Sequence, residues 1–342
     1  MNDFWAAVQA CFSCFQAPSL VLNGRRLSVT KLLGEGGFAY VYLVEDQRSH
    51  EVYALKKIRC PFGAESVATV MREVNACKRF RNTLLVISSV DSMVKQDEDG
   101  TKTVYLLLPY YGKGSLQDLI NDNAINNQSF SEPEVLKYAL GTAEAIRAMH
   151  HHHASGSGGH DDGEAEEDRL LDNQDDSGRS SVPLGEVVPY AHRDVKPANV
   201  MIDDHQRLVL MDLGSVSKAR VHVENRQQAL EIQDEAAELC TLPYRAPELL
   251  NVRPGTTIDE RVDVWSLGCT IYALMYSISP FERAERDTGA SLNLAISNRK
   301  LDFPPTPNYS QDLKDLVANC LTMDCADRPT IDQVISQIQQ LL

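Results

Sequence analysis

Residues 192–199 read His-Arg-Asp-Val-Lys-Pro-Ala-Asn and combine side chains that could act together in one reaction. The Asp194 carboxylate could accept the proton of an attacking hydroxyl group. The Lys196 ammonium, two residues later, could neutralise charge on a transferred phosphoryl group. The Asn199 amide oxygen could bind a divalent cation. Together these side chains could support transfer of a phosphoryl group to a hydroxyl, with Asp194 as the general base.

A further carboxylate follows the predicted strand 207–211. Asp212 stands 18 residues after Asp194 and 13 residues after Asn199. It could bridge Mg²⁺ to the phosphates of a nucleotide, while Asn199 holds the metal from the other side. We therefore predict Asn199 and Asp212 as the metal ligands.

A glycine-rich run at residues 32–42 could bind those phosphates. It reads Leu-Leu-Gly-Glu-Gly-Gly-Phe-Ala-Tyr-Val-Tyr and predicts a strand, a turn and a second strand. Small residues let backbone N–H groups approach phosphate oxygens closely. Val41 stands where a β-branched side chain would cover a purine ring. The nucleotide-binding candidates in this run are Leu33, Gly34, Glu35, Gly36, Gly37, Phe38, Ala39 and Val41.

The predicted strand 52–58 carries a lysine that could reach the same phosphates. Alternation along a strand places Ala54 and Lys56 on one face, with Lys57 as a solvated residue on the other. A helix is predicted over 65–80, and its Glu73 could form an ion pair with Lys56. Glu65 is the weaker alternative partner.

A third strand, 103–108, leads into a predicted hinge at 109–112. Leu108 would limit the depth of a nucleotide pocket. Pro109 has no N–H group and would offer only its carbonyl to an adenine, so the backbone of Tyr111 would supply the donor and the second acceptor. Asp118 could bind the ribose hydroxyls.

The second half of the chain is predicted to be mainly helical. A capping signal at Ser131 predicts a helix over 132–150. The following segment, about 151–182, is rich in His, then Gly and Ser, then acidic residues, and we expect it to be a disordered insertion within a domain. The run His150–His153 could bind a metal, although a flexible tract is the favoured interpretation.

Residues 215–242 contain neither Gly nor Pro, and strong helix formers predict a helix within 224–239. Thr241 and the motif Ala-Pro-Glu at 246–248 close this segment. We expect Glu248 to pair with Arg328, and Asp263 to hold the backbone of the catalytic loop.

These motifs occur in the order and spacing of eukaryotic protein kinases, which the chain resembles over residues 28–340. Gly-Glu-Gly-Gly-Phe-Ala-Tyr-Val, Tyr-Ala-His-Arg-Asp, Leu-Met-Asp-Leu-Gly-Ser and Tyr-Arg-Ala-Pro-Glu are similar to the Numb-associated kinases, and within them to the myristoylated and palmitoylated serine/threonine kinases. The family more often has phenylalanine where Leu213 stands, a variation that still fills an apolar position.

The resemblance implies an α+β, bilobal protein kinase fold with a small β-rich N-lobe at 28–112 and a large helical C-lobe at 113–342. It implies ATP and Mg²⁺ as cofactors, proteins with Ser or Thr acceptors as substrates, and a capacity for autophosphorylation. Asp194, Lys196 and Thr241 would be the catalytic residues, and Lys196 and Thr241 favour Ser/Thr over Tyr as acceptor. Tyrosine autophosphorylation is also compatible with this group.

Residues 1–27 are interpreted as an N-terminal tail. Its first part holds four aromatic residues and two cysteines with almost no charge. Cys11 and Cys14 could accept palmitate. The resemblance implies that the protein is acylated near its N-terminus and held on Golgi, vacuolar or other endomembranes. The alternative is a helix or strand packed on the folded domain. Asn2 stands where myristoylation would need glycine, which departs from the resemblance.

The composition of the chain argues against several other classes of protein. The net charge of −15, of which 150–181 contributes −7 (nine acids, two bases), argues against nucleic acid as a partner. The eight cysteines lack the spacing of a zinc site and are expected to be reduced in a cytoplasmic protein, and no apolar run reaches the length of a membrane span. The alternative functions are a pseudokinase or trafficking scaffold and a small-molecule kinase.

One regulatory hypothesis follows from a count. Between Gly214 and Leu242 the hydroxyl residues are Ser215, Ser217 and Thr241. Arg193, which pairs with a loop phosphate in many kinases, therefore has few such partners. We expect constitutive activity, with glutamates of the predicted helix in the place of the phosphate.

Overall fold

The computed structural model describes residues 19–153 and 187–342, which form two compact units. The smaller unit contains the residues up to Asn82 and Ile87–Tyr110, and the larger contains Thr83–Val86 and Tyr111–Leu342. The predicted hinge at 109–112 spans this division. Within the described ranges, every helix is too short or too polar to cross a membrane.

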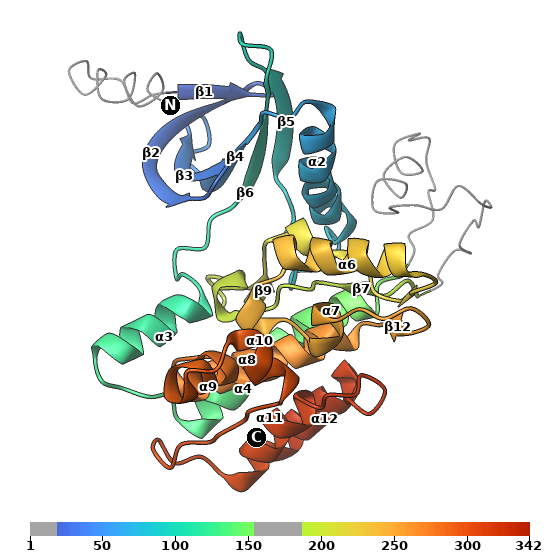
Figure 1. Ribbon diagram of the computed structural model, residues 1–342. Helices are drawn as coiled ribbons and strands as arrows, with labels where there is room; N and C mark the ends of the chain where they lie inside the picture. Colours follow the sequence, from blue (N-terminus) through green and yellow to red (C-terminus); the bar gives the residue numbers. More distant parts are fainter. Residues whose placement is uncertain (1–18, 154–186) are drawn as a thin grey trace. The chain divides into compact units, whose positions relative to one another are not determined.

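The smaller unit is an antiparallel sheet with one helix (Figure 1). The strand order is β1-β2-β3-β4-β6-β5. The elements are β1 (Ser19–Leu22), β2 (Arg25–Glu35), β3 (Ala39–Asp46), β4 (Val52–Cys60), α2 (Ala64–Arg79), β5 (Asp91–Gln96) and β6 (Lys102–Pro109). One sheet face is covered by a buried apolar cluster that includes Leu27, Val44, Leu55 and Leu107. Alternation places Ala54 and Lys56 on the opposite face of the sheet.

Strand β1 corrects the predicted start of the folded domain, which was placed at residue 28. Ser19–Leu22 pairs with Ser28–Arg25 of β2 across a turn at Asn23 and Gly24. Both turn residues have positive φ, 45° and 87°, as a two-residue hairpin of matching twist requires. The Asn-Gly pair was the available sequence signal.

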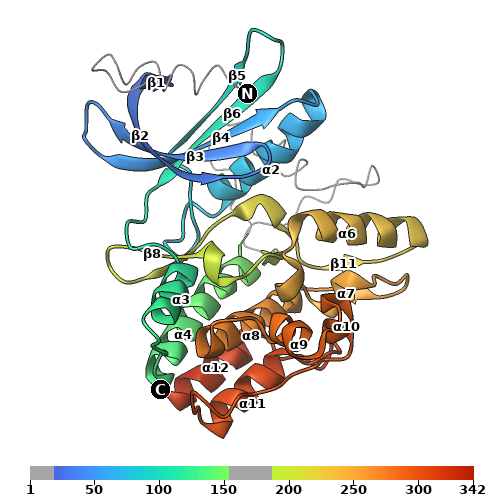
Figure 2. The same cartoon turned by 60° about the vertical axis from the view of Figure 1, so that its left-hand side comes forward.

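The larger unit is mainly helical (Figure 2). It also has three short antiparallel strand pairs, β7–β10, β8–β9 and β11–β12. Its α-helices are α3 (Leu116–Ile125), α4 (Glu132–His150), α6 (Arg226–Leu239), α7 (Pro247–Leu250), α8 (Arg261–Tyr276), α9 (Pro280–Thr288), α10 (Leu292–Ser297), α11 (Gln311–Cys320) and α12 (Ile331–Leu341). Its strands are β7 (Tyr190–Ala191), β8 (Val200–Ile202), β9 (Leu208–Leu210), β10 (Ser217–Lys218), β11 (Val221–His222) and β12 (Thr257–Ile258). Helix α8 is buried along nearly its whole length and forms the centre of this unit.

A β-rich unit and a helical unit are the α+β architecture that the sequence predicted. Helix α4 begins and ends at the predicted residues, and the capping box of Ser131 with Glu134 is present. Helices α2 and α6 and strands β4, β6 and β9 also lie where they were predicted. The local signals of caps and periodicity thus sufficed for the long elements.

The predicted insertion lies mostly outside the described residues, but its ends are defined. His153 and Val187 form an antiparallel bridge, and the Val188 N–H donates to the His152 carbonyl at 2.8 Å. The segment 154–186 therefore leaves and re-enters the larger unit at neighbouring backbone positions.

Candidate active site

The catalytic loop of the larger unit brings together the three predicted catalytic residues. Lys196 Nζ donates to Asp194 Oδ2 at 2.7 Å and to Thr241 Oγ1 at 2.6 Å. The Thr241 N–H donates to Asp194 Oδ1 at 2.8 Å. Thr241 lies 47 residues after Asp194 in sequence, so the fold of the intervening segment creates this cluster. Both oxygens of the carboxylate are held in a fixed orientation, which a general base needs.

Asn199 fixes the same carboxylate from within the loop. Its Nδ2 donates to the Asp194 backbone carbonyl at 2.9 Å and to Asp194 Oδ2 at 3.0 Å. Two acceptors at this atom assign it as the nitrogen, so the amide oxygen points to the other side. An oxygen so directed is a suitable ligand for a hard cation.

Asp212 is placed by the backbone on either side of it. The preceding residue, Met211, donates its N–H to the Asn199 carbonyl at 2.9 Å and accepts from His192 Nε2 at 2.9 Å. Asp212 itself has φ 61°, a left-handed conformation that aspartate tolerates better than most residues. Leu213 is buried, as expected for an apolar position. Asp212 and Asn199 are thus held on adjoining segments, and their oxygen donors suit Mg²⁺.

A buried carboxylate supports the backbone of the loop. Asp263 of α8 accepts the N–H groups of His192 at 2.7 Å and Arg193 at 2.8 Å, as predicted. His150 Nε2 also donates to it, at 3.0 Å. Burial acts to raise the pKa of Asp263, but these hydrogen bonds and the His150 charge outweigh it, so the pKa lies below its ordinary value. The carboxylate stays charged and holds the loop.

His150 therefore corrects the interpretation of residues 150–153 as a flexible tract. Its side chain is buried, because it continues the buried face of α4 four residues after Ile146. His151 Nε2 lies 2.8 Å from Asp332 Oδ2, so it too has a partner. The helical spacing of His150 was the signal for its structural role.

In the smaller unit, Lys56 pairs with the predicted glutamate of α2. Lys56 Nζ donates to both carboxylate oxygens of Glu73, at 2.7 and 2.8 Å. Lys56 lies opposite Val41 in β3, and Ala54 lies opposite Leu108 in β6. Cross-strand partners and alternate residues share a sheet face. Four predicted nucleotide-binding residues therefore line one face of the sheet.

Lys57 departs from its prediction as a solvated residue. It is half-buried, and burial lowers the pKa of its ammonium group below the ordinary value. Its cross-strand neighbours are the large side chains of Tyr40 and Tyr105. Alternation predicts on which side a residue lies but not how large its neighbours are.

The glycine-rich run forms the turn between β2 and β3. The Gly36 N–H donates to the Ala39 carbonyl at 2.7 Å, which closes the turn. A Cβ atom added at Gly34 or at Gly37 would meet no neighbouring atom. Open space at these positions leaves room for a group to approach the backbone. Leu33, Glu35 and Phe38 are all at least partly exposed in the same run.

The predicted hinge residues fall on both sides of the division between the units. Pro109 ends β6 in the smaller unit, and Tyr111 begins the larger one. Burial raises the pKa of Tyr111 to about 12. Asp118 caps α3: its Oδ2 accepts the Ser115 N–H and hydroxyl at 2.7 Å each. Its ribose contact stays a prediction, and it would be made by a carboxylate already engaged in a cap.

Helix α6 is joined to the catalytic loop at its C-terminal half. Arg193 Nη1 lies 3.6 Å from Glu235 Oε2, and the Arg193 side chain is 5% exposed. Arg245 Nη2 donates to the Cys240 carbonyl at 2.5 Å. Glu248 and Arg328 form the predicted ion pair with bonds of 2.7 and 3.0 Å. A glutamate of the helix therefore does face Arg193.

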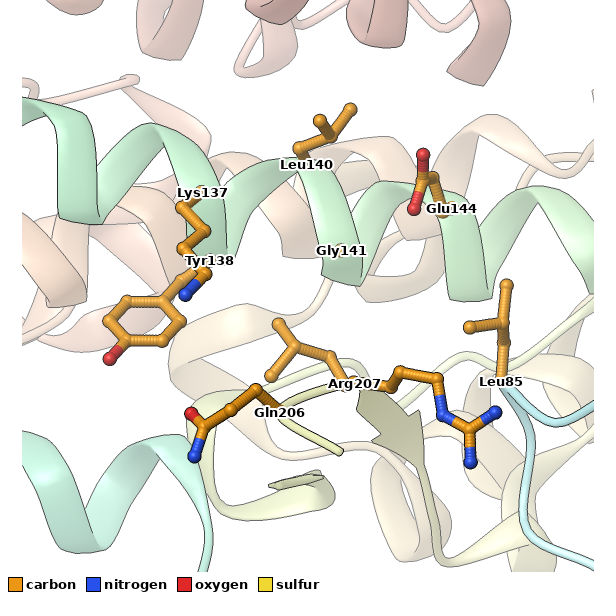
Figure 3. A pocket seen from close by; sticks show the side chains of 9 residues that line it. Leu85, Lys137, Tyr138, Leu140, Gly141, Glu144, Gln206 and Arg207 are labelled. Carbon is orange, nitrogen blue, oxygen red and sulfur yellow. The ribbon is translucent and has the colours of Figure 1, made fainter. Parts of the chain in front are cut away.

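The larger unit also has a cavity of about 240 Å³ between α4 and the β8–β9 turn (Figure 3). Tyr138, Gly141 and Glu144 of α4 line it opposite Gln206 and Arg207. Its lining residues include none of the predicted site residues, and we assign it no role in the reaction.

The chain is similar to a known protein family over most of its length. The family model described as "Protein kinase domain" matches residues 27–155 and 189–338. The break between the two matched parts, 156–188, contains the nine acidic residues counted in 150–181.

Curated relatives match over nearly their whole length. Serine/threonine-protein kinase ENV7 of Saccharomyces cerevisiae is 37% identical, over 97% of this chain and 96% of the relative. Serine/threonine-protein kinase ppk13 of Schizosaccharomyces pombe is 36% identical, over 95% and 93%. Serine/threonine-protein kinase 16 of Homo sapiens is 34% identical, over 96% and 94%. The chain therefore belongs to the protein kinase family, and within it to the serine/threonine-protein kinases.

Proposed function

We propose that this kinase transfers the γ-phosphate of ATP to serine and threonine hydroxyls of proteins, with Asp194 as the general base. The observation that carries the proposal is the hydrogen-bonded cluster of Asp194, Lys196 and Thr241. A carboxylate oriented in this way can take the proton of an attacking hydroxyl. The adjacent ammonium group can stabilise negative charge that develops on the phosphoryl group.

Each unit supplies a different part of the reaction. In the smaller unit, Lys56 held by Glu73 would bind the nucleotide phosphates, and Val41, Ala54 and Leu108 would contact the adenine. In the larger unit, Asn199 and Asp212 would hold Mg²⁺, which neutralises phosphate charge when bound. Asn199 also orients the base through its hydrogen bond to Asp194 Oδ2.

The test is phosphate transfer from ATP to the protein itself and to a generic protein substrate, with identification of the phosphoamino acids. Asp194→Asn and Lys56→Met should each abolish transfer. Asp204→Asn, an exposed aspartate, and Lys57→Met, on the opposite sheet face, are the matched controls and should retain it. Phosphoserine or phosphothreonine is the expected product. Nucleotide binding by wild type without any transfer would favour the pseudokinase or trafficking scaffold.

We further propose that the kinase is peripheral on endomembranes through palmitoylated Cys11 and Cys14. These residues lie outside the described part of the chain, and the support is the composition of the tail, which combines two cysteines with aromatic residues and little charge. Two acyl chains would anchor firmly, since each buried methylene contributes about 0.8 kcal/mol.

Acylation is tested by hydroxylamine-sensitive labelling and membrane fractionation of the full chain. The Cys11→Ser, Cys14→Ser double variant should lose the label and move to the soluble fraction. Cys325→Ser, a half-buried thiol of the folded part, is the control and should remain labelled and membrane-bound. Unchanged fractionation of the double variant would reject the anchor.

A further inference from the structure

Two exposed aromatic side chains meet at the tip of the glycine-rich run. Phe38 is 57% exposed and Phe62 is 73% exposed. Their ring centroids are 6.0 Å apart and the planes meet at 78°, an edge-to-face arrangement. Such geometry is attractive because the positive edge of one ring meets the negative face of the other. Phe62 thus contacts the tip although it lies 24 residues later in sequence.

The backbone of each phenylalanine is hydrogen-bonded to a different element. The Phe38 carbonyl accepts the N–H of Arg59 at 2.9 Å, so the loop tip lies against the end of β4. The Phe62 N–H donates to Ser66 Oγ at 3.0 Å, within the first turn of α2. The same helix carries Glu73, the partner of Lys56. The ring contact therefore connects the glycine-rich run to the element that orients the phosphate-binding lysine.

We propose that Phe62 is a positioning residue for ATP. Its ring holds Phe38, and through Phe38 it restricts the glycine-rich turn to a narrow range of positions relative to Lys56. A turn held before the nucleotide arrives loses less conformational entropy when it binds. Phe62 acts on nucleotide affinity without contacting the nucleotide. The proposal rests on the proposed function, since it assumes that the glycine-rich run binds phosphates.

The size of the effect follows from the contact. An aromatic pair contributes modestly, so Phe62→Ala should weaken ATP binding about two- to tenfold. The weaker binding should appear as a higher Kd and a higher KM for ATP. The kcat value at saturating ATP should stay within about twofold, because the Asp194 cluster lies in the other unit and is unaltered.

The experiment is a double-mutant cycle on the full chain, read by binding of a fluorescent ATP analogue and by steady-state kinetics. Phe62→Ala and Phe38→Ala should each raise the Kd, and the double variant should be no worse than the weaker-binding single variant, because both remove one contact. The single variant Phe62→Tyr keeps the aromatic ring and should have the wild-type Kd. Val52→Ala, an exposed apolar residue of β4, is the control and should leave the Kd unchanged.

The outcomes separate this inference from the proposed function. An unchanged Kd in Phe62→Ala, or additive effects in the double variant, would overturn the positioning role while transfer by wild type continues. Absence of transfer in wild type would overturn the proposed function, yet the binding cycle would still report on Phe62. An equal loss with Phe62→Tyr would also overturn the proposal, because the tyrosine ring preserves the contact.

Discussion

At the scale of single residues, Thr241 gives the loop 192–199 two hydrogen bonds that its own residues cannot supply. The Lys196 ammonium group donates one hydrogen bond to Asp194 and another to the Thr241 hydroxyl. The hydroxyl therefore holds the lysine at a defined distance from the base. A valine at this position has nearly the same shape but cannot accept the hydrogen bond.

We predict that Thr241→Val lowers kcat about ten- to a hundredfold at saturating ATP. A hydrogen bond to a charged group contributes about 1.5–3 kcal/mol, and about 1.4 kcal/mol corresponds to a tenfold change in rate. Thr241→Ser keeps the hydroxyl and should retain most of the activity. Initial rates at saturating ATP and protein substrate measure this, and a serine variant as slow as valine would contradict it.

Cys240 is the neighbour of Thr241, and its thiol is predicted to be unreactive. It is 5% exposed, and burial raises its pKa to about 12. The thiolate is the reactive form, so below pH 9 almost none of it exists. Iodoacetamide at pH 8 should leave Cys240 unlabelled by peptide mass spectrometry, and labelling should follow only when denaturant unfolds the chain. Rapid labelling of the folded protein would show that the segment opens readily.

The proximity of the side chains in the loop 192–199 could be predicted from the sequence. Asp194, Lys196 and Asn199 lie within one short loop, so their spacing in sequence already limits their spacing in space. The neighbouring histidines 151–153 favour a flexible tract for His150 as well, whereas its position on the buried face of α4 determines its role. Phe62 carried no motif, and its contact with Phe38 depends on how a loop of the sheet folds back.

At the scale of elements, helix α6 explains how its segment can be held without phosphate. Glu235 faces Arg193, Arg245 binds the carbonyl at the helix end, and Gln233 Oε1 accepts the Val252 N–H at 3.4 Å. Together these contacts fix both the helix and the Thr241 segment that follows it. The geometry supports the hypothesis that glutamate takes the place of a phosphate group.

We therefore predict that phosphatase treatment leaves most activity intact, whereas Glu235→Ala lowers it about fivefold. The Glu235 side chain is 32% exposed, so the pair contributes no more than about 1 kcal/mol after solvent screening. Glu238→Ala, an exposed glutamate of the same helix, is the control. Activity before and after phosphatase is the measurement, and loss of nearly all activity on dephosphorylation would reject the hypothesis.

The elements were predicted well where local signals are strong. The capping box at Ser131 and the apolar spacing after it define α4 to the residue. Strand β1 was assigned to the tail because its four residues are too few for a periodicity argument, although Asn23 and Gly24 mark a hairpin. The pairing of Arg193 with Glu235 among several glutamates of α6 depends on tertiary packing, which periodicity does not report.

At the scale of the whole molecule, the segment 154–186 interrupts the described part of the larger unit at one place. Its two ends are joined by the bridge of His153 with Val187, and the kinase family model matches the chain on both sides of it. Folding must bring the two ends of a loop together, and the entropic cost of this closure rises with the length of the loop. Removing it should therefore not weaken the larger unit.

We predict that replacing residues 155–185 by a four-residue Gly-Ser turn leaves kcat within about twofold and raises the melting temperature by a few degrees. Shortening the loop in this way reduces its closure cost by about 2 kcal/mol. The formal net charge would change from −15 to −8, since the replaced residues carry nine acids and two bases. Differential scanning fluorimetry and transfer assays test this, and a lower melting temperature would show that the segment contributes to the fold.

The hairpin of β1 and β2 has a consequence for the geometry of substrate encounter. Ser19 is paired with Ser28, so the sheet begins only five residues after Cys14. The turn of this hairpin is held to the sheet because Asn23 Nδ2 donates to Asp91 Oδ1 at 2.8 Å. Five residues span at most about 17 Å. With an acyl chain on Cys14, the edge of the sheet would stay within about 17 Å of the headgroups. The enzyme would then search a surface instead of a volume, and proteins on the same membrane would be encountered at a raised effective concentration.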